Sequence, residues 1–193
     1  MNIETGELNI FIGSMFSGKT SKLINIYNKY KYCNKNIIVI NYILDKRYTD
    51  KSILYTHDKR EIPCVLSKNL FDTFDLNNDI NNKKFMDTSV ILINEAQFFK
   101  DIVKWVKIAV SPPFNKIIYL SGLDGDYKRE VFGNWLELVP FCDSIHKLTA
   151  ICNKCKCNDA IFSHRLISDS EQELIGNDIY IPLCRLCYDE INK

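Results

Sequence analysis

The segment Gly13-Ser-Met-Phe-Ser-Gly-Lys-Thr20 decides the fold expected for this chain, because it follows the pattern G-x-x-x-x-G-K-[ST] of phosphate-binding loops. The short apolar run Leu8-Asn-Ile-Phe-Ile12 precedes it and predicts a buried strand. Residues 18–32 follow it and carry apolar side chains at helical spacing. A chance match in a glycine-rich turn is the alternative, but it would not bring a strand before the motif and a helix after it.

Each residue type in this loop has a physical role in binding a nucleoside triphosphate. The glycines let the backbone bend so that successive N–H groups point at phosphate oxygens, and the N-terminus of the helix adds a favourable dipole. Lys19 places a positive charge on the terminal phosphates, and the hydroxyl of Thr20 can ligate Mg²⁺. We therefore predict contacts with ATP from the whole loop, which consists of Gly13, Ser14, Met15, Phe16, Ser17, Gly18, Lys19 and Thr20.

The rest of the N-terminal three quarters alternates between buried strands and helices. Strands are predicted at residues 36–40, 89–93 and 116–120, and a helix runs from Phe99 to Val110, where Pro112-Pro113 stops it. Strands without polar alternation that alternate with helices favour a parallel sheet covered on both faces. We expect an α/β fold like that of P-loop NTPases, with the polar residues 67–88 as a surface excursion.

An acidic residue follows the predicted strand 89–93. Ligands of open α/β sheets bind beyond the carboxyl ends of the strands, so Glu95 is the candidate general base that takes a proton from an acceptor hydroxyl. The alternative is a solvated loop glutamate. Its neighbour Asn94 is a weaker partner for hydrated Mg²⁺ than a carboxylate would be.

Two arrangements of the metal remain open at this point. The ion depends on Thr20 and phosphate oxygens alone, or Asp45, just past the second strand, assists it. Arg47 offers a planar fork of donors to phosphate. An ordinary surface ion pair is the other interpretation of Asp45 and Arg47.

Five of the eight cysteines lie in the last quarter of the chain. Four of them form the pairs Cys152-x2-Cys155 and Cys184-x2-Cys187, and each pair can supply two thiolates to one tetrahedral Zn²⁺. Unmetallated core thiols and redox-active dithiols are the alternatives. Four protein ligands leave no open position, so the site is expected to be structural, with Cys157 as a spectator. We place a domain boundary here, with a nucleotide-binding domain at 1–148 and a zinc-binding domain at 149–193.

Composition excludes several classes of protein. The net charge is +1, from 25 basic and 24 acidic residues, whereas nucleic-acid binders usually show a basic excess. No run approaches the roughly 20 apolar residues of a membrane span. The polar start Met-Asn-Ile-Glu-Thr-Gly-Glu does not look like a secretory signal. We expect a cytoplasmic protein in a reducing compartment, without nucleic-acid or membrane partners.

Together these motifs resemble the thymidine kinases of the cellular and poxvirus-like type, which carry a zinc-bearing C-terminal lobe. The resemblance covers nearly the whole chain. It rests on the phosphate loop and on Asp45-Lys-Arg-Tyr48, Thr56-His57-Asp58, Glu95-Ala-Gln-Phe-Phe99, Gly122-Leu-Asp-Gly-Asp-Tyr-Lys-Arg129, Phe132-Gly133, Leu148-Thr-Ala-Ile-Cys152 and Cys184-Arg-Leu-Cys-Tyr188.

The resemblance implies transfer of the γ-phosphate of ATP to the 5′-hydroxyl of thymidine with Mg²⁺, and of deoxyuridine as well. Glu95 matches the family's catalytic base. Besides the loop, the residues that match the family's ATP and metal region are Asp45, Lys46, Arg47, Asn94, Glu95, Ala96 and Gln97. Those that match the thymidine pocket and its closing lasso loop are Met15, Phe98, Leu123, Tyr127, Phe132, Ser163, Gln172, Glu173, Leu174, Ile175, Gly176 and Tyr180.

The resemblance also implies a homotetramer and feedback inhibition by thymidine triphosphate (dTTP). Three departures from the family pattern bear on the site: Asn94 replaces an aspartate, Ser14 replaces a proline or similar residue, and Tyr127 replaces a phenylalanine. Two other functions stay open, a kinase of the same fold for another deoxynucleoside and a catalytically weakened nucleotide-binding relative. A zinc-ribbon nucleic-acid-binding ATPase is disfavoured by the charge balance.

Overall fold

A computed structural model describes residues 5–43, 52–56, 60–78, 82–168, 170–174, 176 and 178–192 of the 193-residue chain. Its centre is a six-stranded sheet with the order β5-β2-β6-β7-β1-β8, in which every neighbouring pair is parallel. The strands are β1 (Glu7–Gly13), β2 (Ile37–Tyr42), β5 (Val65–Ser67), β6 (Val90–Ile93), β7 (Ile117–Gly122) and β8 (Ser144–Leu148). The α/β fold with a parallel sheet is therefore confirmed.

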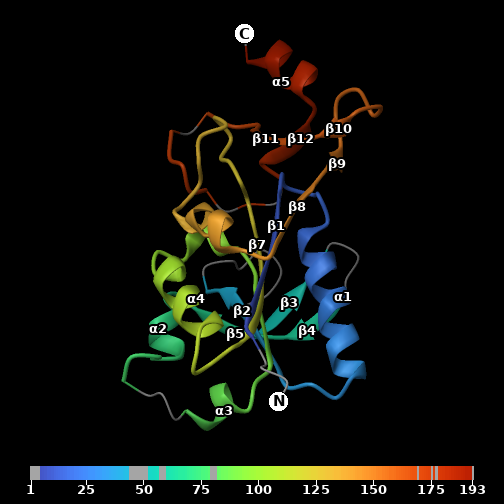
Figure 1. The fold of residues 1–193 in the computed structure, drawn as a ribbon. Helices are drawn as coiled ribbons and strands as arrows, with labels where there is room; N and C mark the ends of the chain where they lie inside the picture. The colour runs from blue at the N-terminus through green and yellow to red at the C-terminus, as the bar shows by residue number, and fades with distance from the viewer. Residues whose placement is uncertain are drawn as a thin grey trace.

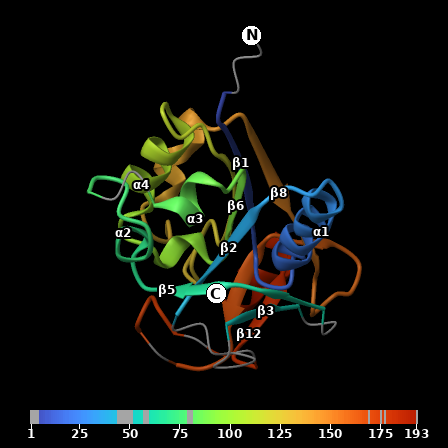
Figure 2. The same ribbon diagram turned by 90° about the horizontal axis from the view of Figure 1, so that it is seen from below.

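Helices cover both faces of this sheet (Figures 1 and 2). Helix α1 (Lys19–Tyr32) packs on one face, next to the hairpin of β3 (Ile53–Tyr55) and β4 (Glu61–Pro63). Helices α2 (Leu70–Thr73), α3 (Lys83–Met86) and α4 (Ile102–Val110) lie on the other. Alternate residues of β6 serve the two cores, because successive side chains of a strand point to opposite faces.

The segment 67–88 differs from its prediction. It was expected on the surface, but its apolar side chains Leu70, Phe74, Leu76 and Phe85 are buried in the core that α4 also helps to form. The described polar residues Asp72, Asn77, Asn78, Lys83 and Lys84 are exposed, so the described parts of the segment pack on the sheet by their apolar side chains. The prediction failed because it was based on the polar composition of residues 67–88 as a whole, which does not reveal the four buried apolar side chains.

The remaining elements lie at the carboxyl end of the sheet. The 3₁₀ helices η1 (Ala96–Phe98) and η2 (Trp135–Phe141) follow β6 and β7 in the chain. Beyond β8, the pairs β9 (Ala150–Ile151) with β10 (Asp159–Ala160) and β11 (Phe162–Arg165) with β12 (Tyr180–Leu183) precede α5 (Arg185–Ile191). Figure 1 shows these last elements stacked together at one end of the molecule. Among the described helices, none is long and apolar enough to cross a membrane.

Candidate active site

A cavity of about 410 Å³ lies between the carboxyl ends of the central strands and the C-terminal elements. Residues 15–21, from the phosphate loop and the start of α1, form one side, and residues 53–56, from β3 and the residue after it, form another. Asn41, Asn94, Glu95 and Gln97 reach it from the strand ends. A position beyond the carboxyl ends of parallel strands is where α/β proteins bind their ligands.

The phosphate loop has the backbone conformation that its glycines permit. Gly13 has φ of 151° and Gly18 has φ of 81°, and a Cβ on Gly13 would lie 2.3 Å from the carbonyl oxygen of Leu148. The Nζ atom of Lys19 donates to the carbonyl oxygens of Gly13 (3.0 Å) and Ser14 (2.7 Å), so the cation lies over the loop. The hydroxyl of Ser17 is buried without a hydrogen-bond partner within the described part of the chain. A buried polar atom without a partner favours a ligand at this place.

Glu95 is held at the wall of the cavity by its own backbone and by Gln97. Its φ of 56° is in the left-handed region, which is uncommon for a residue other than glycine, and its side chain is 8% exposed. The Nε2 atom of Gln97 donates to Oε2 of Glu95 at 2.6 Å. The backbone N–H of Leu123 donates in turn to Oε1 of Gln97 at 3.0 Å, which orients the amide. Gln97 therefore links the carboxylate to the segment that follows β7.

Gln97→Leu should lower kcat by roughly tenfold or more, since a hydrogen bond to a charged group contributes about 1.5–3 kcal/mol. The acid limb of the pH–rate profile should also move to higher pH, because the lost donor stabilised the charged carboxylate. Steady-state kinetics across pH measure both effects. An unchanged profile with an unchanged kcat would show that Gln97 does not orient Glu95.

Three neutral side chains form a buried chain of hydrogen bonds across the ends of β2, β6 and β7. The hydroxyl of Ser121 donates to Oδ1 of Asn94 (2.8 Å), and Nδ2 of Asn94 donates to Oδ1 of Asn41 (2.9 Å). All three residues are at most 3% exposed. The oxygen and the nitrogen of the Asn94 side chain are thus both hydrogen-bonded within the protein. None of these three side chains carries a charge.

Aromatic rings form the apolar part of the wall. Phe98 packs edge-on against Phe132 with ring centroids 5.4 Å apart, and Tyr42 stacks on Phe98 at 4.9 Å. Leu123 and Tyr127 complete this side. Gly133 makes the close packing possible, since its φ is 70° and a Cβ there would lie 2.3 Å from the carbonyl oxygen of Gln97. A flat apolar ligand such as a nucleobase suits such a surface.

The segment between the cysteine pairs covers the cavity. Gln172, Leu174, Gly176 and Tyr180 line it. The Nε2 atom of Gln172 donates to Oδ2 of Asp126 (2.8 Å) and to the carbonyl oxygen of Val131 (3.3 Å). These bonds tie the segment to the loop that follows β7. Two further hydrogen bonds join the phosphate loop to the C-terminal elements. The hydroxyl of Ser14 donates to the carbonyl oxygen of Ala160 (3.2 Å), and the N–H of Met15 donates to Oγ of Ser163 (2.9 Å).

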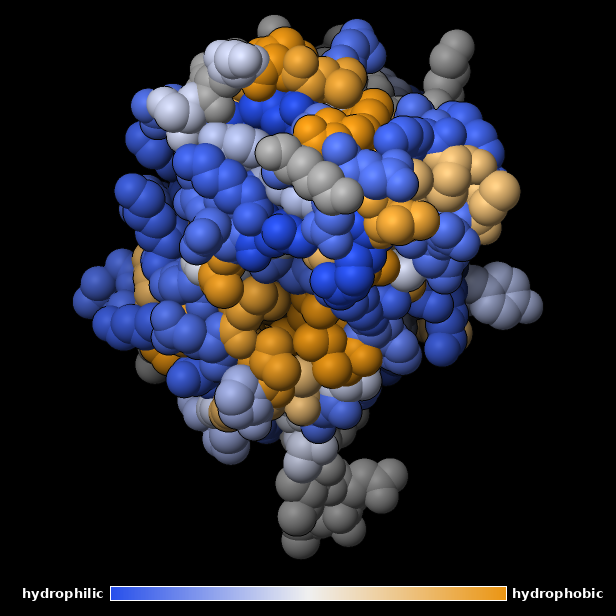
Figure 3. Space-filling view, turned by 90° about the horizontal axis from the view of Figure 1, so that it is seen from above, coloured by the Kyte–Doolittle hydropathy of each residue, from blue (hydrophilic) through white to orange (hydrophobic). Residues whose placement is uncertain are grey.

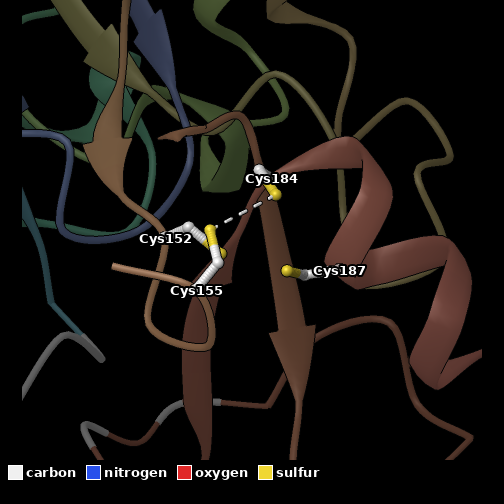
Figure 4. A group of neighbouring side chains, drawn as sticks. All are labelled: Cys152, Cys155, Cys184 and Cys187. Atoms are coloured by element: carbon white, nitrogen blue, oxygen red, sulfur yellow. Dashed lines mark hydrogen bonds between the residues drawn. The ribbon is translucent and has the colours of Figure 1, made fainter. Parts of the chain in front are cut away.

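The four paired cysteines converge at the base of the C-terminal elements (Figure 4). Their sulfur atoms all lie within 4.8 Å of one another, and no disulfide joins them. The backbone N–H groups of Cys157 and Asn158 hold the pKa of the Cys155 thiol below its ordinary value, which favours the thiolate. Four convergent sulfurs fit one tetrahedral zinc ion and leave no open position.

Comparison with known proteins decides what this site belongs to. The family model described as thymidine kinase matches residues 6–188. The chain belongs to the thymidine kinase family. The thymidine kinase of Sheeppox virus (strain KS-1) is 35% identical over 96% of this chain and 98% of the viral protein. Those of Vaccinia virus (strain Western Reserve) and Yaba monkey tumor virus (strain VR587) are each 38% identical, over 95% and 100% of this chain and over 97% and 100% of their own length.

Within this thymidine kinase family member, most of the predicted site residues come together in one cavity. Among the residues predicted to bind ATP or thymidine, four that the structure describes do not line it. Gly13 and Ser14 lie at the base of the loop, Ala96 is fully buried because it packs into the main core, and Glu173 is exposed. Asp45, Lys46, Arg47 and Ile175 lie outside the described residues, so their predicted roles stay predictions.

Several residues of the kinase cavity were not predicted from the sequence. Asn41 and Asp126 line it, as do the residues of β3 and Thr56, which follows that strand. The motif containing Thr56 marked this region by resemblance but assigned it no role. Arg165 lies behind the cavity wall and was also missed. Asp126 also stands in a motif that carries the resemblance, whereas Asn41 and Arg165 stand in none, and the partner of Asn41 lies 53 positions away.

Proposed function

We propose that this thymidine kinase family member transfers the γ-phosphate of ATP to the 5′-hydroxyl of thymidine, and of deoxyuridine. The observation that carries the proposal is that Glu95 and Lys19 line one cavity with an aromatic wall. A carboxylate, a phosphate loop and an apolar slot in one cavity are what transfer from a triphosphate to a nucleoside requires.

The donor half is the phosphate loop with the N-terminus of α1. On binding ATP, Lys19 exchanges its two loop carbonyls for phosphate oxygens, and the buried hydroxyl of Ser17 gains an acceptor. Thr20 is the second residue of α1, next to Lys19, and lines the cavity, so its hydroxyl is the ligand we assign to Mg²⁺. The ion supplies charge neutralisation on the phosphates when bound.

The acceptor half is the aromatic wall with Glu95. The base of the nucleoside lies against Phe98 and Phe132, which places its sugar toward the loop. Glu95 then accepts the proton of the 5′-hydroxyl as that oxygen attacks phosphorus, while Gln97 holds the carboxylate. The C-terminal segment covers the cavity and excludes water, which would otherwise compete for the phosphoryl group.

The neutral chain Asn41–Asn94–Ser121 supports a proposal about the metal. We propose that Asn94 positions the end of β6 and is not a charged partner of Mg²⁺, because both ends of its amide are engaged within the protein. The ion then depends on Thr20 and the phosphates, with Asp45 as a further proposed acid.

Asn94→Asp should therefore tighten binding of the divalent ion to the ATP complex. The gain should be roughly fivefold, since two charges at 4 Å interact by about 1 kcal/mol even in water. Electron paramagnetic resonance of Mn²⁺ in the presence of ATP measures this affinity without turnover. Asn134→Asp makes the same charge change at an exposed position and should leave the affinity unchanged. Equal affinities in wild type and Asn94→Asp would contradict this prediction and show that position 94 lies too far from the ion for a charge there to act on it.

We further propose a homotetramer, inhibition by dTTP and a cytoplasmic location. The edge strand β8 exposes Ile145, and the nearby 3₁₀ helix η2 exposes Val139 and Phe141. Figure 3 also shows an apolar area near the middle of a mainly hydrophilic face, and exposed apolar surface of this kind favours contact with another protein. Because the cavity runs from the phosphate loop to the aromatic wall, dTTP can occupy both halves at once. A reducing cytoplasm would keep the four zinc-binding thiols available.

Steady-state phosphorylation of a panel of nucleosides by ATP and Mg²⁺ tests the substrate. Thymidine and deoxyuridine should have the highest kcat/KM, because the apolar wall that Phe98 and Phe132 form suits the flat ring of a pyrimidine. A purine deoxynucleoside as the preferred substrate would indicate another kinase of this fold. ATP binding without turnover of any nucleoside would indicate a catalytically weakened relative.

A further inference from the structure

Arg165 is a buried cation that the proposed reaction does not use. It ends β11, pairs across the sheet with Tyr180 of β12, and is 5% exposed. It does not line the cavity, whereas its partners Tyr127, Gln172 and Tyr180 do. A buried guanidinium is costly unless its donors are used, so its contacts deserve a functional explanation.

Within the described residues of the cover segment (170–174, 176 and 178–180), neutral oxygens accept four hydrogen bonds from this guanidinium. Its Nε and Nη2 atoms donate to the hydroxyl of Tyr180 at 3.0 Å and 2.7 Å. Nη1 donates to the carbonyl oxygen of Glu171 at 2.6 Å, and Nη2 donates to that of Gln172 at 3.2 Å. The Tyr180 hydroxyl then donates to the carbonyl oxygen of Leu174 at 2.9 Å. One side chain thus gathers three carbonyls of the cover segment, two directly and one through Tyr180.

The flat face of the same guanidinium lies on a ring of the opposite wall. Its Cζ atom is 3.8 Å from the ring centroid of Tyr127, which belongs to the loop after β7, and 5.3 Å from that of Tyr180. Gln172 makes a second link between the same two parts through Asp126. Arg165 therefore joins the cover segment to the α/β part at the back of the nucleoside pocket.

We propose that Arg165 is a positioning residue for the nucleoside, which acts by holding Tyr127 and residues 171–174 in the conformation that contacts the base. The inference rests on the proposed function for the identity of the ligand. Only a planar donor fork stacks on one ring and donates in several directions at once, whereas lysine offers a compact point charge. Loss of Arg165 should thus weaken nucleoside binding and leave the phosphate loop and Glu95 in place.

The test compares Arg165→Lys and Arg165→Met with wild type. The KM for thymidine should rise roughly tenfold or more in Arg165→Met, with a smaller rise in Arg165→Lys, since removal of donors leaves buried carbonyls without partners. The kcat at saturating thymidine and the KM for ATP should change by less than about threefold, because Arg165 and the residues that it holds do not act at the phosphates.

Arg129→Lys is the matched control. Arg129 also stacks on aromatic rings of the C-terminal elements, 4.7 Å from the ring centroid of Tyr188, but it is half-exposed and pairs with Asp189. Its substitution should leave the KM for thymidine unchanged. Zinc content and circular dichroism of each variant report folding, and Arg165→Lys decides the question if Arg165→Met does not fold.

Amide hydrogen exchange without nucleoside separates this inference from the proposed function. Exchange at residues 170–174 should become faster in both Arg165 variants and stay unchanged in Arg129→Lys. This result would support the role of Arg165 even if thymidine proved not to be the substrate. Unchanged exchange there, or a fall in kcat with an unchanged KM for thymidine, would overturn the inference.

Discussion

Glu95→Gln is expected to lower kcat by roughly 10²–10⁴-fold, the usual contribution of a positioned general base. The substituted amide cannot take the proton of the 5′-hydroxyl, but it keeps the size of the side chain. ATP affinity should stay nearly unchanged, because the loop contacts of Lys19 and the backbone do not depend on this carboxylate. Steady-state kinetics and equilibrium binding of ATP measure the two quantities.

A control for this prediction is Glu137→Gln, the same change at an exposed position of η2. It should retain wild-type kcat. If Glu95→Gln also retained it, the assignment of the base would be wrong, and Asp126, the other carboxylate among the described residues that line the cavity, would become the candidate.

Cys184→Ser is expected to abolish stable zinc binding. Substitutions of residues that only support metal ligands already lower affinity by about 10–100-fold, so the loss of a ligand should exceed that. Cys184 joins β12 to α5, and β12 pairs with β11, the strand that carries Ser163 and Arg165. Loosening this connection should raise the KM for thymidine more than the KM for ATP. Elemental analysis and kinetics measure these effects.

Cys157→Ser provides the comparison, because Cys157 is exposed and lies outside the cluster of four sulfurs. It should keep one zinc ion per chain and wild-type kinetics. Wild-type protein without zinc would refute the four-thiolate site itself.

The parts of the fold that were predictable depend on local pattern. The phosphate loop, the buried runs that became β1, β2, β6 and β7, and the helix α4 each carry their signal within a short window. The cysteine pairs were predictable for the same reason, since ligand spacing is local. Strands β5 and β8 were missed because one has three residues and the other is an edge strand whose middle residues are exposed.

The parts of the site that were not predictable depend on contacts between distant residues. The sequence showed that Asn94 is neutral, but not that its partners are Asn41 and Ser121, which lie 53 and 27 positions away. Likewise, Ser14 departs from the family pattern, and the structure gives its hydroxyl a partner 146 positions away, at Ala160. Arg165 carries no motif, and its importance appears only when the cover segment is folded over Tyr127.

The most direct test of the central claim is a single-turnover reaction with γ-labelled ATP, Mg²⁺ and thymidine. We expect the label to appear in thymidine 5′-monophosphate at a rate that falls roughly 10²–10⁴-fold in Glu95→Gln. Release of the label as inorganic phosphate, without any labelled nucleotide product, would contradict the account.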